Sequence, residues 1–283
     1  MWADCAKGVD SSRGFAYTAA GKYPECRIFE TPALEAEMSD FVRRNDTNCA
    51  RKSGESSCHK EYHYTDVAVQ RDRYAPGLVG TRNDDIVAAV SAAIHVLAGD
   101  QAPAPFDIKG QREALLLVAH YVGDKHQPMH VGAIYLDAAG LRVDPDTDGF
   151  DPATATRGAN QIVAVNGTGS KRHLVANLHH LWDAVPIWQT VPNIGPAWVA
   201  RARSVPITPG AAAGWSTAWA TETLEQARGA VADLSFGAND SGNSGTWTVA
   251  IPGRYAAKMN AVKERQLTLA GARLTQVLQS LCP

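Results

Sequence analysis

The chain has 283 residues, which is long enough for one large domain or two small ones. Apolar residues make up 45% of the chain and charged residues 20%, a composition that excludes a disordered or fibrous protein. The formal net charge of −2 excludes a global basic field of the kind that drives non-specific DNA binding, so a nucleic-acid substrate would need local positive charge, which bound metal could supply.

Helical patterns dominate once the irregular first segment, from Gly8 to about Tyr62, has passed. Apolar residues recur at three- and four-residue spacing, which is typical of amphipathic helices. Asn83 and Asp84 can cap one of these helices, and Pro128 ends the strongest of them. The expected helices are Pro32–Arg44, Asp84–Ala98, Lys109–His126, Lys171–Trp188, Ala211–Leu234 and Tyr255–Leu281.

Strand signals are scarce, and only short runs such as Gln161–Val165 alternate suitably. A long Asp-, Gly- and Pro-rich stretch, Ala138–Asn160, indicates a loop. Within it, DPDTDG (Asp144–Gly149) resembles the start of a calcium loop, but Ala155 stands at the twelfth position, so a solvated acidic turn is favoured. The sequence therefore predicts a mostly α fold, with residues 1–283 forming a single domain that has long loops and a few short strands.

The five cysteines are too widely spaced for a tetrahedral zinc site. A Cys49–Cys58 disulfide would close a polar, irregular loop, and buried free thiols are an equally open alternative. With an odd number of cysteines, one is left without a partner. No apolar run reaches the roughly 18 residues needed to span a bilayer, so we expect no membrane partner. The first residues, MWADCAKGVDSSRG, do not have the pattern of a signal peptide.

Histidines and aspartates cluster on two of the expected helices. His120 and Asp124 are four residues apart, so both side chains point from one helix face, and His179 and Asp183 repeat this spacing. Imidazole nitrogen and carboxylate oxygen are the ligands expected of zinc in a hydrolytic site. The alternative is that each pair is a hydrogen bond on a helix surface. The apolar setting of His120, LLLVAHYV, argues against this, because an unpartnered imidazole is costly to bury.

Four segments in order carry a resemblance: WAD (Trp2–Asp4), YHYTD (Tyr62–Asp66), HYVGDKHQPMH (His120–His130) and NLHHLWD (Asn177–Asp183). With them the chain resembles the zinc-dependent single-strand nucleases typified by the fungal nucleases S-one and P-one, a family related to bacterial zinc phospholipase C. The resemblance implies an all-helical fold of that type. It also implies hydrolysis of single-stranded DNA and RNA to 5′-phosphorylated products, with 3′-nucleotidase activity left open.

The resemblance also implies a set of zinc ligands. Asp124 would bridge one zinc to a neighbouring third zinc, while a second zinc would be more exposed. His179 is preferred over His180 because of its spacing to Asp183, and His63 is preferred over His59. The ligands implied for the first zinc are Asp4, His63, His120 and Asp124, and those for the second are His130, His179 and Asp183. His126 is expected at the surface.

Four further residues stand where the family contacts its substrate. Lys7 matches a basic residue beside the scissile phosphate, so Lys7 and Asp124 are the expected catalytic residues. Tyr64 and Asp66 match positions that stack a base and hydrogen-bond its edge. Asn160, in RGAN, matches a Gly-Gly-Asn segment that lines the same pocket, with one glycine replaced by alanine.

The chain departs from the family at its beginning. In the family, the terminal tryptophan and a nearby histidine, in a segment before WAD, complete the third zinc site, whereas this sequence starts at WAD. We therefore expect a lost N-terminus, whose missing part could hold the partner of the odd cysteine, and two zincs per chain in place of three.

The expected protein is a secreted or periplasmic monomer acting on single-stranded nucleic acid or nucleotides. A phospholipase C-like zinc hydrolase and an inactive, truncated zinc-binding protein remain as alternatives.

Overall fold

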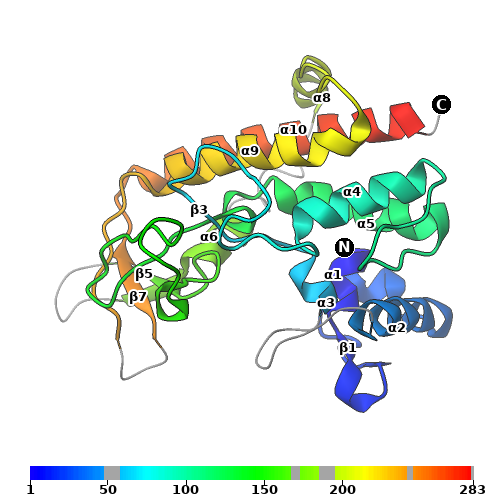
Figure 1. Ribbon diagram of the computed structural model, residues 1–283, viewed down its shortest axis with the longest axis horizontal. Helices are drawn as coiled ribbons and strands as arrows, with labels where there is room; N and C mark the ends of the chain where they lie inside the picture. The colour runs from blue at the N-terminus through cyan, green and yellow to red at the C-terminus, as the bar shows by residue number, and fades with distance from the viewer. Residues whose placement is uncertain (48–57, 167–172, 185–194, 241–244, 282–283) are drawn as a thin grey trace.

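The computed structural model describes residues 1–47, 58–166, 173–184, 195–240 and 245–281 (Figure 1). Helices make up most of these ranges, which confirms the mostly α fold. The α-helices are α1 (Trp2–Ala6), α2 (Pro32–Thr47), α3 (Cys58–Glu61), α4 (Ile86–Leu97), α5 (Gly110–Lys125), α6 (Leu178–Ala184), α8 (Pro196–Arg203), α9 (Ala212–Val231) and α10 (Tyr255–Leu281).

The remaining elements are short. The 3-10 turns are η1 (Ser11–Arg13), η2 (Pro24–Phe29), η3 (Pro128–His130) and η4 (Pro152–Thr154). The strands are β1 (Val9–Asp10), β2 (Ala16–Tyr17), β3 (Val67–Ala68), β4 (Gly132–Ala133), β5 (Ile162–Asn166), β6 (His173–Asn177) and β7 (Trp247–Ala250).

The long helices α2, α4, α5, α9 and α10 form where the apolar spacing predicts them, within a few residues at each end. The start of α4 differs from expectation, because the cap is Asp85 rather than Asn83 or Asp84. The side chain of Asp85 accepts hydrogen bonds from the amides of Val87 and Ala88, at 2.9 and 3.1 Å. Three consecutive polar residues could each fill this role, so sequence alone left the choice open.

The expected helix Lys171–Trp188 is wrong over its first part. Strand β6 occupies 173–177 and pairs antiparallel with β5, while β7 pairs parallel with the other edge of β5 (Figure 1). Only α6 is helical within the described part of that range. Strand pairing with β5 and β7, distant in sequence, decided the backbone conformation here, a tertiary effect that local periodicity does not contain.

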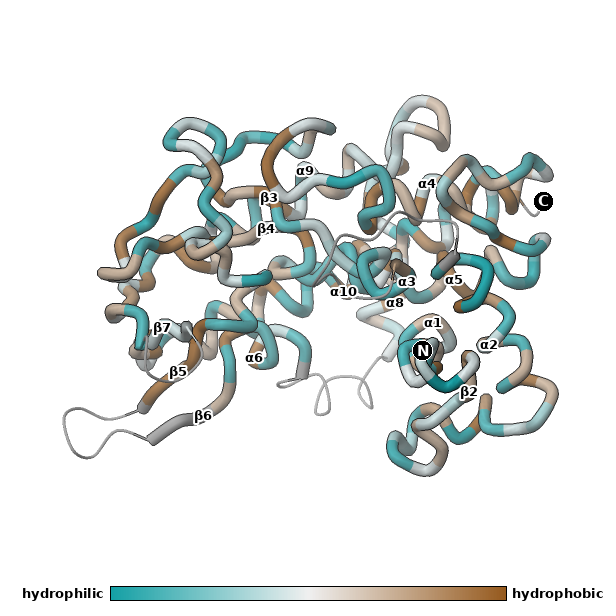
Figure 2. Tube along the Cα trace, turned by 60° about the horizontal axis from the view of Figure 1, so that its bottom comes forward, coloured by the Kyte–Doolittle hydropathy of each residue, from teal (hydrophilic) through white to brown (hydrophobic). Residues whose placement is uncertain are grey.

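Two large buried apolar clusters form most of the core of the described chain, and a small third cluster consists of Ala68, Ala133 and Tyr135. The first lies among α1, α2, α4, α5 and α9, and the second lies among β5, β7, α6, α9 and α10. Figure 1 shows α9 and α10 running side by side along the length of the molecule, with α4 and α5 beneath one end and the β5–β7 sheet at the other. Figure 2 shows hydrophobic stretches at β5 and beside β3. Because α9 contributes to both clusters, it connects the two halves.

A disulfide joins Cys5 of α1 to Cys26 of η2 across 21 residues. Cys58 is also disulfide-bonded, whereas Cys49 and Cys282 lie outside the described residues. Cys5–Cys26 was not predicted. It fastens the segment that carries Asp4 to the following loop. Among the helices of the described ranges, none is both long and apolar enough to cross a membrane.

Candidate metal centre

The centre is built around α5 and the turn that follows it. His120 and Asp124 lie one turn apart on α5, with Nε2 of His120 3.0 Å from Oδ2 of Asp124. After α5 ends, Gln127 caps the 3-10 turn η3, which places His130 on the same side. The motif HYVGDKHQPMH thus folds as a helix, a tight reversal and a turn, and brings three of its polar side chains together.

Parallel pairing of β3 with β4 brings the YHYTD segment to this turn. The amide of Thr65 donates to the carbonyl of His130 at 2.9 Å, and Val67 pairs with Gly132. A Cβ at Gly132 would lie 2.4 Å from the Cβ of Ala227, so only glycine lets β4 approach α9 this closely. His63 is thereby held beside α5.

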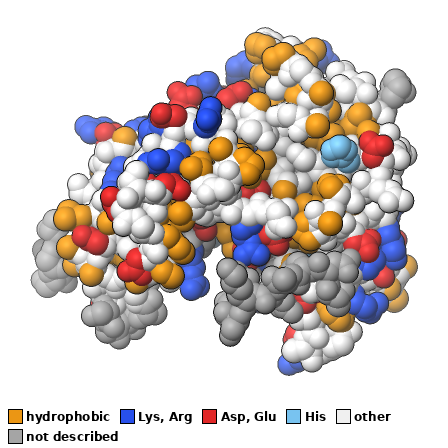
Figure 3. All heavy atoms as spheres, viewed as in Figure 1, with side chains coloured by type: hydrophobic (Ala, Val, Ile, Leu, Met, Phe, Trp, Pro, Cys, Tyr) orange, Lys and Arg blue, Asp and Glu red, His pale blue; other side chains and the backbone are white. Residues whose placement is uncertain are grey.

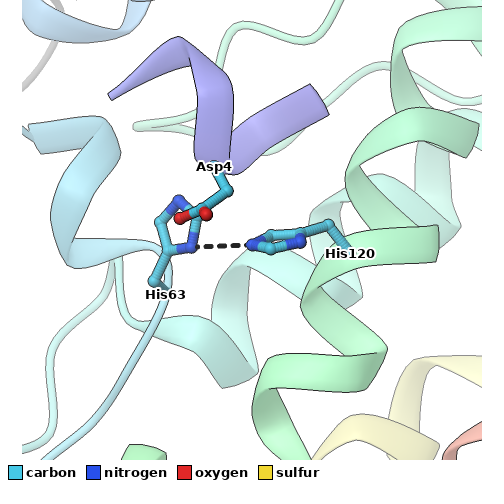
Figure 4. A group of neighbouring side chains, drawn as sticks. All are labelled: Asp4, His63 and His120. Atoms are coloured by element: carbon cyan, nitrogen blue, oxygen red, sulfur yellow. Dashed lines mark hydrogen bonds between the residues drawn. The ribbon is translucent and has the colours of Figure 1, made fainter. Parts of the chain in front are cut away.

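Asp4, His63 and His120 form the first ligand group, whose ligand atoms all lie within 4.8 Å of one another. Figure 4 shows their side chains converging from three separate segments, α1, the loop after α3, and α5. Nδ1 of His63 lies 3.2 Å from Nε2 of His120 and 2.8 Å from Oδ2 of Asp124. Asp124 therefore contacts both imidazoles through one oxygen. The amino group of Met1 lies 2.7 Å from Nδ1 of His120.

His130, His179 and Asp183 form the second ligand group. Nε2 of His130 and Nε2 of His179 each lie 3.3 Å from a carboxylate oxygen of Asp183, and the two imidazole rings stack with centroids 4.9 Å apart. The groups are neighbours, because Nδ1 of His130 lies 3.9 Å from Oδ2 of Asp124. All seven sequence-predicted ligand residues thus come together in two adjoining groups.

Hydrogen bonds in the second group fix which nitrogen of each imidazole faces Asp183. Nδ1 of His130 donates to the carbonyl of His63 at 2.9 Å, and Nδ1 of His179 donates to the carbonyl of Gly158 at 2.7 Å. In a neutral imidazole the other nitrogen is then an acceptor, so both Nε2 atoms present lone pairs to a carboxylate. Acceptors that converge in this way need a proton or a cation between them, and this donor set fits zinc.

Charges in the centre favour an ionised Asp124 and a neutral His63, whereas the carboxylates of Asp124 and Asp183 outweigh burial and raise the pKa of His130. Burial opposes ionisation of Asp124, but His120, His130 and His63 hold its pKa well below the usual range. Burial and Lys7 lower the pKa of His63 to about 3, so its lone pair is available at neutral pH. A deprotonated imidazole beside an ionised carboxylate is the state in which these groups bind metal.

A pocket of about 410 Å³ opens over both ligand groups. Its walls include Lys7 from α1 and Lys263 from α10, and Nζ of Lys7 lies 2.8 Å from Oδ1 of Asp4. On the face of the molecule seen in Figure 3, acidic and basic side chains are interspersed, with no broad patch of one sign. Positive charge for an anionic substrate is provided within the pocket by Lys7 and Lys263.

The expected base-binding residues are not among the side chains that line this pocket. The hydroxyl of Tyr64 donates to Glu61, and Asn160 is exposed on the RGAN turn. Oδ1 of Asp66 is buried and has no hydrogen-bond partner among the described residues. Burial and the nearby Glu61 raise the pKa of Asp66 to about 6. A buried polar atom without a partner is a candidate for contact with a ligand.

His179 and His126 lie in different surroundings, one in the second ligand group and one beneath α10. His179 faces Asp183 while His180 is exposed, which agrees with the preference for His179. The surface position expected for His126 is wrong. Its Nδ1 lies 2.6 Å from the carbonyl of Val122 and its Nε2 2.8 Å from Arg273, and the ring is buried. Pro128 ends the helix that contains His120, which suggested that His126 lies at an exposed helix end, but α10 packs over His126.

The acidic turn DPDTDG is paired with an arginine side chain. Arg71 donates to Asp144 and lies 3.6 Å from Asp146, while Oδ1 of Asp146 accepts from the amide of Val79 at 2.8 Å. The guanidinium thus stands beside two of the carboxylates that a calcium loop would offer to the ion, and the preference for a solvated acidic turn stays a prediction.

Sequence reasoning missed two residues of the centre. Nε2 of Gln127 donates to Oδ1 of Asp183 at 2.8 Å, which ties the turn after α5 to the second ligand group. Lys263 lines the pocket from α10, a helix that the motifs do not reach. The sequence shows only that Lys263 and Gln266 are polar and three apart on one face of a long helix; that this face is buried comes from the structure.

Comparison with known proteins agrees with this geometry. The family model described as S1/P1 Nuclease matches residues 36–283, which is most of the chain. No curated protein sequence matches the chain.

Proposed function

The chain belongs to the S1/P1 nuclease family, and from this premise we propose that it is a zinc-dependent endonuclease that hydrolyses single-stranded DNA and RNA to 5′-phosphorylated products. The observation that carries the proposal is the pair of adjoining ligand groups under one pocket, linked by the 3.9 Å approach of His130 to Asp124. Zinc hydrolases that act on phosphodiesters require nitrogen and oxygen ligands arranged in this way.

Each ligand group would hold one zinc. Asp4, His63, His120 and Asp124 would hold the first, and His130, His179 and Asp183 the second. When bound, zinc lowers the pKa of water toward neutrality and stabilises negative charge on the phosphate. The chain contributes the orientation of the ligands, because backbone carbonyls fix His130 and His179, and Asp124 contacts both imidazoles of the first group.

Lys7 is the proposed catalytic cation. Its ammonium lines the pocket and is held 2.8 Å from Asp4, a ligand of the first group. Charge accumulates most on the leaving oxygen in the transition state, so a lysine fixed near that oxygen stabilises that state more than the ground state. No side-chain nucleophile is required of the chain.

Preference for single strands follows from the position of the proposed base pocket. None of Tyr64, Asp66 and Asn160 lines the phosphate pocket, so contact with them would require a base to leave its stack. In a duplex this unstacking costs a few kcal/mol, which a single strand largely avoids. The unpartnered Oδ1 of Asp66 supports hydrogen bonding to a base edge.

A phospholipase C-like zinc hydrolase is the second candidate, because the family's ligand set is also used on lipid phosphodiesters. The buried carboxyl of Asp66 favours a base over a lipid chain, since an apolar ligand would leave that group without a partner. A zinc-binding protein without activity is the third candidate.

We further propose that the chain acts as one domain and as a monomer, outside the cytoplasm. The Cys5–Cys26 disulfide supports an oxidising compartment, and the position of α9 in both core clusters supports a single domain.

The test is hydrolysis by the purified, zinc-loaded chain of single-stranded DNA, single-stranded RNA, duplex DNA and phosphatidylcholine vesicles. We expect cleavage of both single strands, at least about tenfold slower cleavage of the duplex, loss of activity with chelator and recovery with zinc. Faster turnover of phosphatidylcholine would favour the phospholipase C-like candidate. Bound zinc with no turnover on any substrate would favour the inactive protein.

A further inference from the structure

Lys263 is a buried lysine on the wall of the proposed active site. It projects from α10, its residue surface is 6% exposed, and it lines the same pocket as both ligand groups. Burying an ammonium costs free energy unless hydrogen bonds or an opposite charge compensate it. The groups that surround the ammonium of Lys263 therefore indicate which kind of ligand this wall of the pocket can bind.

The described chain provides Lys263 with only partial compensation. Its Nζ donates to the carbonyl of Leu181 in α6 and lies 5.9 Å from the ring centroid of Trp182. Across the described ranges, no carboxylate lies within 4.0 Å of this ammonium. A lysine ammonium has three donors, so two remain for a ligand in the pocket.

Two other lysines show that this arrangement is particular to Lys263. Lys7, which lines the same pocket, is paired with Asp4. Lys125 is fully buried, but its Nζ donates to Ser216 and lies 4.5 Å from the ring centroid of Trp219, away from the pocket. Lys263 alone of these three combines burial, an incomplete set of partners and access to the pocket.

We propose that Lys263 is a second phosphate-binding residue, which donates a hydrogen bond to a non-bridging phosphate oxygen of the bound strand on the Asp183 side of the pocket. The inference rests on the proposed nuclease function. Lys7, which follows α1, would then contact the substrate phosphate near Asp4 of the first ligand group, and Lys263 of α10 would contact it near Asp183 of the second. Burial lowers the pKa of Lys263 to about 8, so the side chain is still mostly charged at pH 7.

This contact is expected to act mainly on substrate binding. The ammonium is already held in place by Leu181 and Trp182, and Asp183 acts on it without direct contact, so an incoming phosphate supplies a negative charge within hydrogen-bonding distance. The same interaction is present before and during reaction, so its loss raises KM more than it lowers kcat.

The test compares Lys263→Gln with Lys258→Gln in the zinc-loaded protein. The glutamine side chain of K263Q keeps a donor for the carbonyl of Leu181 but removes the charge. Lys258 lies on the same helix, outside the pocket, and pairs with Asp233 at 3.0 Å, so its replacement is matched in charge. We expect K263Q to raise KM for single-stranded DNA about tenfold, with kcat changed less than about threefold and zinc content unchanged.

Two further measurements separate phosphate binding from a structural role. The slope of log KM against log salt should fall by about 0.7 in K263Q, the value for one lost phosphate contact on a single strand. The Kd of inorganic phosphate, measured by calorimetry on the zinc-loaded protein, should rise about tenfold. K258Q should leave both unchanged, and Lys263→Arg, which keeps the charge, should stay within about threefold of the wild type.

An unchanged KM, salt slope and phosphate Kd in K263Q would overturn the inference. A second result would also overturn the inference. If K263Q loses zinc or fails to fold, and the phosphate Kd of K263R also rises about tenfold, the residue has a structural role. Failure of the wild-type chain to cleave single strands would instead overturn the proposed function, which K263Q does not test.

Discussion

The two ligand groups have similar compositions but are held in place differently. Each has two imidazoles and one carboxylate that is about half exposed, 47% for Asp4 and 42% for Asp183. In the first group a side chain connects the imidazoles, since Asp124 contacts both His63 and His120. In the second, backbone carbonyls fix the imidazoles. The first group therefore depends on one side chain, and the second on the conformation of the main chain.

The difference follows from what surrounds each group. Neighbours in sequence of the first group, such as Ala3, Tyr62 and Tyr121, belong to the first core cluster. Neighbours of the second group, Met129 and Trp182, belong to the second cluster. The centre thus lies where the two halves of the core adjoin, and changes on either side should affect mainly one group.

The largest effect is expected from Asp124→Asn, which removes the charge that both imidazoles of the first group contact. Activity on single-stranded DNA should fall about a thousandfold, and the metal of the first group should be lost. Steady-state kinetics and elemental analysis of the purified variant measure both. Asp72→Asn, an exposed aspartate paired only with Arg228, is the control. Retention of full metal content and activity in D124N would contradict the central role of this side chain.

Gly158→Ala should act on the second group alone. The residue has φ of +55°, and a Cβ would lie 2.6 Å from the carbonyl of Met129, so the carbonyl that holds His179 must move. We expect metal affinity of the second group to fall about 10- to 100-fold, as for other residues that orient ligands.

Gly149→Ala isolates the conformational part of this effect. Gly149 also has positive φ, but its Cβ would meet nothing within 4 Å. Competition with a fluorescent chelator should detect weaker metal binding in G158A and not in G149A. Equal metal affinities in the two variants would show that the carbonyl of Gly158 does not orient His179.

Asp66, whose side chain lies beside Gly158, should make folding stability depend on pH. Burial and Glu61 raise its pKa to about 6, compared with 3.8 in an unfolded chain. The folded state therefore binds the proton more tightly. The stabilisation is complete below about pH 3, where it amounts to about 3 kcal/mol, and it is lost as pH rises through 6.

Urea unfolding of metal-depleted wild type and Asp66→Asn between pH 4 and 7 measures this contribution, since no bound cation then affects the carboxyl. The difference between the two proteins should change by about 2 kcal/mol over that range. A difference that stays constant with pH would contradict the raised pKa.

Ala159→Gly gives the smallest expected effect, and it has the opposite sign. Ala159 follows Gly158 and has φ of +67°, in the left-handed region that costs an alanine about 1 kcal/mol. Glycine at this position, as in the family's Gly-Gly-Asn segment, should raise the unfolding free energy by up to that amount. Denaturant unfolding measures it, and a destabilised A159G would show that the turn is not strained.

The sequence predicted the long helices well because they depend on local spacing, and the seven candidate ligands lie together in the structure, while their role as ligands stays a prediction. His120 and Asp124, and His179 and Asp183, are each separated by one helical turn, and the motif order placed Asp4 and His63 with them. It did not predict β6, whose conformation depends on pairing with β5, or the Cys5–Cys26 disulfide, because spacing does not determine connectivity.

The buried positions of His126 and Lys263 were missed for a related reason. Both positions depend on how α10 packs. For example, Arg273 of α10 contacts His126, the residue that follows α5, across 147 residues of sequence. Helical periodicity identifies the face of α10 that is buried, but it does not identify the helix against which that face packs.

Metal content per purified chain is the most direct test of the central claim that the two groups are separate zinc sites. After loosely bound metal is removed, elemental analysis should find about two zincs in the wild type, and about one in each of His63→Ala and His179→Ala. A folded wild-type protein without zinc would contradict the account, as would a single substitution that removes all the metal.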